Sequence, residues 1–151
     1  MLSKSGLCLA MVLCVSGCSG TTEDKWTKDR PETFPVTGTV TSDGQPLQEA
    51  TVVFRSTGAE PRTAIGRTDA RGNFVLRTFE DGDGAVRGQQ KVSITKTETE
   101  KIPAGINLDE VDFQPKVTSL IPKKYGSPET SGLTAEVTAD GPNEFTFKLG
   151  K

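Results

Sequence analysis

Ser93 and Lys96 have the Ser-x-x-Lys spacing of the serine nucleophile and the lysine in some acyl-enzymes. In those enzymes the two residues share one face of a helix. Here the surrounding residues, 89–96, alternate between polar and apolar, which predicts a β-strand. An offset of three along a strand places two side chains on opposite faces. We therefore expect no catalysis from this pair.

The acidic run Glu80-Asp81-Gly82-Asp83-Gly84 supplies carboxylate oxygens, which suit a hard cation such as Ca²⁺. It lacks the spacing of an EF-hand loop, because its glutamate precedes the aspartates instead of following them. A charged hairpin loop is the interpretation we favour, although the sequence leaves calcium binding open. No spacing fixes any other pair of acidic residues at a separation suited to glycoside hydrolysis.

The chain has no histidine, and its three cysteines, Cys8, Cys14 and Cys18, all lie near the N-terminus. Ser-His-Asp and Cys-His catalysis both need an imidazole base, and histidine and cysteine are the usual zinc ligands. A net charge of −2 does not favour nucleic acid, which selects for clustered basic residues. We predict a protein that is not an enzyme, with no catalytic residue, no metal, no other cofactor and no nucleic-acid partner.

Cys18 follows a short apolar run, residues 7–15. A span of the bilayer takes ~20 apolar residues, so the run fits the apolar part of a secretory signal instead. The motif Val15-Ser16-Gly17-Cys18 resembles a bacterial lipobox. The resemblance implies that the signal peptide 1–17 is removed and that Cys18 carries diacylglycerol and acyl chains. An ordinary secretory signal, leaving Cys18 as a free thiol, is the alternative.

A lipid on Cys18 predicts a protein anchored at the cell envelope, in the outer membrane or on a periplasmic face. Residues 18–34 are polar and charged, which predicts a tether between the lipid and the domain. The membrane is then the first partner of the chain.

From residue 35 onward, short alternating segments are separated by turn residues such as Asp43-Gly44, Asp69–Gly72 and Asp140–Asn143. Alternation with a period of two indicates strands that are buried on one face. Seven strands are predicted: 36–41, 51–55, 63–68, 73–77, 89–96, 133–138 and 145–149. With no amphipathic helix, they predict an all-β fold, a seven-stranded antiparallel Greek-key β-sandwich.

Residues 35–54, PVTGTVTSDGQPLQEATVVF, resemble the opening of a carboxypeptidase regulatory-like domain, which is a transthyretin-like (prealbumin-like) sandwich. Residues 68–74, TDARGNF, resemble the second hairpin of that family. Residues 121–125 and 130–133 resemble the C-terminal half of lipoprotein versions common in planctomycete bacteria. The resemblance covers most of residues 35–149. It implies a transthyretin-like fold and an accessory, non-catalytic role, with no catalytic residue to carry across.

Within the predicted domain, 35–151, residues 97–132 are expected to form an irregular loop, and loops of this length are often functional. Residues 121–125 within it are expected to return to the sandwich. We expect a module that binds another envelope protein through this loop or through open sheet edges, which accept further strands. The alternative is a carbohydrate-binding module with a glycan partner. Four aromatic residues are candidates for stacking on sugar rings: Tyr125, Phe113, Phe79 and Trp26. Aromatic residues near the ends of loops are more often at the edge of a core, and we favour that alternative.

Replacing the lipid-accepting sulfur tests the predicted anchor. Cys18→Ser is expected to abolish metabolic labelling with a fatty acid and to release the protein from the membrane fraction, because the thioether cannot form. Cys14→Ser, within the signal peptide, is the matched control and should keep both properties. Unchanged membrane retention of the Cys18→Ser protein would contradict the prediction.

Overall fold

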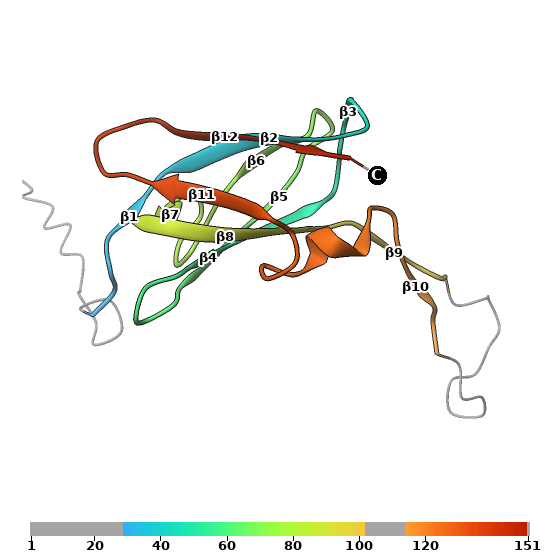
Figure 1. Cartoon of the computed structure of the whole chain (residues 1–151), viewed down its shortest axis with the longest axis horizontal. Coiled ribbons are helices and arrows are strands. Elements are labelled where there is room, and N and C mark those ends of the chain that lie inside the picture. The colour runs from blue at the N-terminus through green and yellow to red at the C-terminus, as the bar shows by residue number, and fades with distance from the viewer. Residues whose placement is uncertain (1–28, 102–113, 151) are drawn as a thin grey trace, which may run out of the picture. The chain divides into compact units, whose positions relative to one another are not determined.

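The computed structural model describes residues 29–101 and 114–150, and its strands pack as layers of a β-sandwich (Figure 1). The predicted signal peptide 1–17, Cys18, Trp26 and Phe113 lie outside the described residues. The elements are β1 (Thr33–Phe34), β2 (Val36–Ser42), β3 (Gln45–Pro46), β4 (Thr51–Ser56), β5 (Thr63–Arg67), β6 (Asn73–Val75), β7 (Ala85–Val86), β8 (Gly88–Thr95), β9 (Thr97–Thr99), β10 (Val117–Ser119), the 3₁₀ helix η1 (Lys123–Gly126), β11 (Leu133–Val137) and β12 (Asn143–Leu149).

Two four-stranded sheets make up the sandwich. One has the order β11-β8-β4-β5, and the other has the order β12-β2-β3, with β6 also paired to β2. Two short ribbons, β1–β7 and β9–β10, and a single bridge between Ile65 and Arg77 complete the pairing among the described residues. All seven strands predicted from alternation are present, and five further strands of two or three residues join them. The expectation of an all-β sandwich is therefore confirmed.

One strand pair departs from the expected antiparallel arrangement. β12 runs parallel to β2, with Asn143 opposite Val36 at one end and Leu149 opposite Ser42 at the other. Hairpins force neighbouring strands to be antiparallel, whereas strands joined by a long connection can run in the same direction. Nearly the whole domain lies between these two strands, so no short turn constrains their direction. The Greek-key arrangement stays a prediction.

The two sheets meet through a cluster of phenylalanine rings. Phe54 on β4 lies 6.3 Å from Phe74, 5.7 Å from Phe145 and 5.9 Å from Phe147, measured between ring centroids. Gly38 on β2 makes room for this cluster, because an added Cβ would lie 2.6 Å from the Phe74 ring and 2.2 Å from the Phe145 carbonyl oxygen. The absence of a side chain at Gly38 thus lets β2, β6 and β12 close over Phe54.

The structure differs from the predicted domain boundaries in two places. The predicted tether, 18–34, ends inside the fold, because Thr33 and Phe34 form β1 against β7 and Phe34 packs on the core. The compact part of the described chain begins at Pro31. The segment expected to be irregular, 97–132, contains the β9–β10 ribbon and η1 in its described parts.

Truncating the ring at the centre of the core measures how much the fold depends on it. Phe54→Ala is expected to lower the free energy of unfolding by ~3–5 kcal/mol, because it leaves a cavity between the sheets. Val117→Ala, at a position where the side chain is 61% exposed, should change it by less than ~0.5 kcal/mol. Chemical denaturation followed by circular dichroism gives both values, and equal losses would contradict the packing described here.

Candidate functional site

The Ser93 and Lys96 pair is not assembled into a catalytic site. Ser93 is buried and lies opposite Val53 of β4, between the core residues Val92 and Ile94. Lys96 follows the end of β8, and its carbonyl accepts a hydrogen bond from the Leu120 N–H at 2.8 Å. The strand geometry therefore separates the two side chains, as the alternation of residues 89–96 predicts.

The acidic loop 80–84 uses the carboxylate of Asp83 to hold the backbone of the loop and of the residues just before it. Asp83 accepts hydrogen bonds from the N–H groups of Thr78 at 2.6 Å, Phe79 at 2.9 Å and Glu80 at 3.1 Å. Asp81 points elsewhere and forms an exposed ion pair with Arg77 at 3.2 Å. In the part of the chain that the structure describes, no group of three potential metal ligands converges here or elsewhere. The geometry favours the charged hairpin loop over a calcium site.

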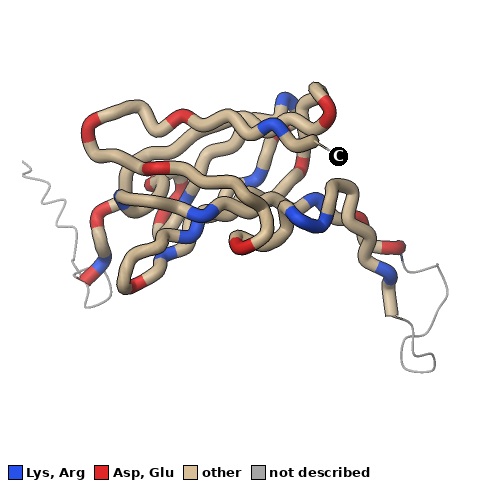
Figure 2. The backbone as a smooth tube through the Cα atoms, in the orientation of Figure 1, with Lys and Arg blue, Asp and Glu red and all other residues tan. Residues whose placement is uncertain are grey.

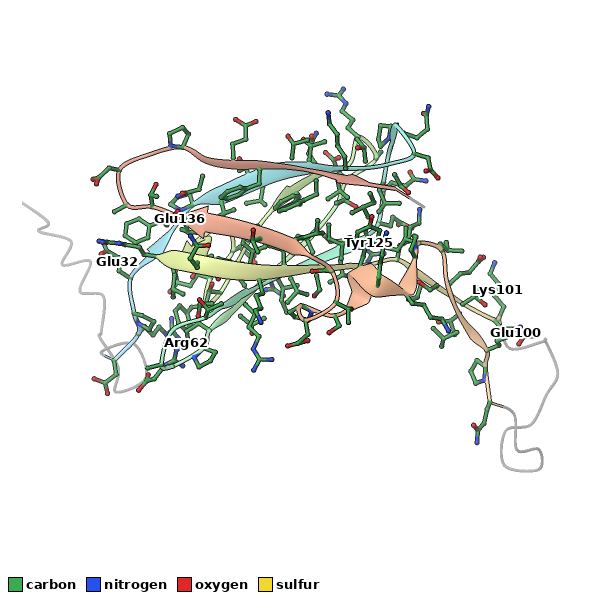
Figure 3. The ribbon with its side chains drawn as sticks, viewed as in Figure 1. Glu32, Arg62, Glu100, Lys101, Tyr125 and Glu136 are labelled. Atoms are coloured by element: carbon green, nitrogen blue, oxygen red, sulfur yellow. The ribbon has the colours of Figure 1, made fainter. Side chains whose placement is uncertain are left out.

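Tyr125 lies at the edge of the core, which is the favoured alternative to a role in stacking on sugar rings. Its side chain is only 7% exposed and extends from η1 toward the end of β12 (Figure 3). Its hydroxyl group lies 3.1 Å from both the N–H and the carbonyl oxygen of Gly150, and the Lys124 ammonium lies 4.9 Å from the ring centroid. Phe79 is half-buried. The burial of Tyr125 leaves little of its ring available for stacking on a sugar.

Two carboxyl groups have shifted pKa values, and both belong to turns. The pKa of Asp69 lies below its ordinary value because the backbone N–H of Asn73 donates to it, with a further bond from the Arg71 N–H. The pKa of Glu129 is lowered mainly by the hydroxyl of Ser127. Figure 2 shows acidic and basic residues interspersed along the described chain.

The sandwich is closed on one side by main-chain bonds between the sheets. Ile65 at the β5 edge exchanges two backbone hydrogen bonds with Arg77, with N···O distances of 2.8 and 2.9 Å. This bridge links the end of one sheet to the segment that follows β6 in the other. A further strand cannot pair with β5 at this position.

The other side is open, because β11 and β12 are the last strands of their sheets. The Leu149 carbonyl accepts from the Asp43 N–H at 3.1 Å, so the main-chain groups of Leu149 face β2. The side to which main-chain N–H and C=O groups point alternates from residue to residue along a strand. The groups of Glu144, Thr146 and Lys148 therefore point away from β2.

The open edge of β12 ends where η1 meets the C-terminus. The next residue with groups on that side is Gly150, and the Tyr125 hydroxyl bonds both of them. On the open side of β12, three residues therefore present main-chain groups with no partner in the described chain: Glu144, Thr146 and Lys148. Their side chains are exposed. This edge is the candidate functional site.

Sequence reasoning anticipated open edges but could not say which strands would form them. The order of strands in a sheet depends on the whole fold. Alternation in the sequence shows only which side chains lie on each face of a strand. One signal was present in β12 itself. Glu144 and Lys148 place charges on its outer face, a common device that keeps an edge strand from aggregating.

No protein-family model matches the chain, and no curated protein matches its sequence. Among solved structures, the chain is similar to a 9R-lipoxygenase from Cyanothece PCC8801, with 15% identity and a TM-score of 0.36. The match covers 81% of this chain but only 17% of the lipoxygenase chain. A likeness this weak carries no argument about function.

The role of Asp83 can be tested against calcium binding. Asp83→Ala is expected to cost ~1–3 kcal/mol of unfolding free energy, because three backbone N–H groups lose their acceptor. Asp81→Ala removes only an exposed ion pair, worth less than ~1 kcal/mol. Thermal melting of the native protein should not change with added Ca²⁺. A calcium-dependent rise in melting temperature that Asp83→Ala abolishes would contradict the structural role.

Proposed function

We propose that this chain is a lipid-anchored lipoprotein of the cell envelope whose β-sandwich is a non-catalytic interaction module. The proposal includes the likeness to carboxypeptidase regulatory-like domains, which rests on residues 35–54 and 68–74. The all-β sandwich is compatible with that likeness. The proposed partner is another envelope protein that offers an extended segment.

The observation that carries this proposal is the open edge of β12. An extended peptide that pairs with a sheet edge gains affinity from main-chain hydrogen bonds and specificity from its alternating side chains. Glu144, Thr146 and Lys148 supply N–H and C=O groups for such pairing, in a strand that β2 and the phenylalanine cluster hold rigid. A rigid edge loses little conformational entropy on binding.

The anchor supports the same interpretation. The lipobox-like motif places the lipid at Cys18, and the polar residues that follow connect it to the domain. Among the helices of the described chain, none is long and apolar enough to cross a membrane. A tether of this kind would keep the open edge at the membrane surface, within reach of other envelope proteins.

A proline in β12 tests the role of the edge directly. Thr146→Pro removes an N–H that faces away from β2, so the strand can keep its bonds to β2 while its outer edge is blocked. Circular dichroism and melting temperature should stay close to native. Capture of envelope proteins by crosslinking in intact cells, followed by mass spectrometry, should fall by about tenfold or more.

The matched control is Val117→Pro in β10. The main-chain groups of Lys116 and Leu120 bond toward the β9 side, so the N–H of Val117 faces outward in the same way. This variant should capture partners as the native chain does. Loss of capture with Val117→Pro but not with Thr146→Pro would move the binding site to residues 97–132.

A further inference from the structure

We propose that the open edge of β12 pairs with β12 of a second copy, antiparallel and about a two-fold axis at Thr146. The inference rests on the proposed use of this edge but does not depend on the lipid anchor. It specifies one occupant, the chain itself, and one register. Three features of β12 support it: the direction of its main-chain N–H and C=O groups, the positions of its charged side chains, and the residues just beyond its two ends, which cannot pair.

The backbone groups fix which registers are available. Residues in a hydrogen-bonded antiparallel pair must both direct their N–H and C=O groups at each other. On the open side of β12 these residues are Glu144, Thr146 and Lys148. Pairing about Thr146 sets Thr146 opposite its copy and Glu144 opposite Lys148 of the other chain. All three residues then exchange bonds, about six in total.

Other antiparallel registers either place like charges opposite each other or form fewer main-chain hydrogen bonds. Centring on Glu144 or on Lys148 would set like charges opposite each other, which destabilises a strand pair. A shift toward the C-terminus would place Gly150 opposite Glu144, although its groups already bond the Tyr125 hydroxyl. A shift the other way would place Lys148 opposite Pro142, which has no N–H to donate.

The ends of the strand agree with the register at Thr146. In that pairing the next position beyond Lys148 is Gly150, and its counterpart is Pro142 of the other chain. Gly150 is already occupied by Tyr125, and proline cannot donate. In this register, main-chain hydrogen bonds can therefore form only between Glu144, Thr146 and Lys148 of the two copies.

The side chains are complementary on both faces. Glu144 and Lys148 are exposed and form no ion pair within the described chain, and the register would bring them together twice across the two-fold axis. On the inner face Phe145 would lie opposite Phe147 of the second copy. Phe145 is only half-buried and already packs on Phe54, so pairing would bury more of its ring.

The predicted dimer is a weak one. A single pair of edge strands buries less than the ~1,200 Å² that a stable protein–protein interface takes. Confinement to a membrane surface would raise the effective concentration and favour pairing. The interface therefore suits a protein that dimerises at the envelope.

Charge reversal tests the register. The full chain is studied by sedimentation equilibrium over a range of concentrations. Glu144→Lys and Lys148→Glu should each weaken dimerisation by about tenfold or more, since each places like charges opposite each other twice. The double variant should regain native dimerisation. An equimolar mixture of the two single variants should also regain it, as a heterodimer.

Lys123→Glu is the matched control, because it makes the same charge change at an exposed residue of η1 and should leave dimerisation unchanged. A native chain that stays monomeric, also when crosslinked at the membrane, would overturn the inference. Single reversals without effect, or a mixture that fails to recover, would overturn it too. If the native chain is monomeric and Thr146→Pro abolishes the capture of partners, the proposed function holds and only the pairing with a second copy is wrong.

Discussion

The packing of Phe54 against three rings of the facing sheet is the interaction on which the rest of the structure depends. It joins β4 to β6 and β12, strands from opposite layers and distant parts of the chain. The chain has no disulfide framework to replace it, because its three cysteines all lie within the first eighteen residues. Burial of aromatic surface, at ~25 cal/mol per Å² of apolar area, is therefore the main source of cohesion between the layers.

The same packing explains how β12 can be a core strand and an open edge at once. Phe145 and Phe147 hold its inner face against Phe54, and β2 pairs with one side along its length. The other side keeps its main-chain groups unpaired except at Gly150. An edge held in this way is extended before any partner arrives, so binding a strand needs little rearrangement. The core packing and the proposed recognition thus involve the same seven-residue segment.

Much of this fold could be predicted from the sequence, and the failures have a common cause. The seven strands follow from local alternation. The Asp43-Gly44 pair predicts a turn, and both residues have positive φ angles in the structure, 49° and 81°. The return of residues 121–125 to the sandwich could be predicted, and Ile121 and Tyr125 are buried. The parallel pairing of β12 with β2 and the bond of the Tyr125 hydroxyl to Gly150 could not, because each joins residues far apart in the sequence. Edges are likewise defined only when every other strand has been placed.

Amide hydrogen exchange measured residue by residue by NMR tests the central claim most directly. Phe145 and Phe147 direct their N–H groups at β2, whereas Thr146 and Lys148 direct theirs outward. In dilute solution the account predicts alternating protection along β12, with slow exchange at the two phenylalanines and fast exchange at Thr146 and Lys148. Equal and strong protection at all four positions in the monomeric chain would show that the edge is already covered, and would contradict the account.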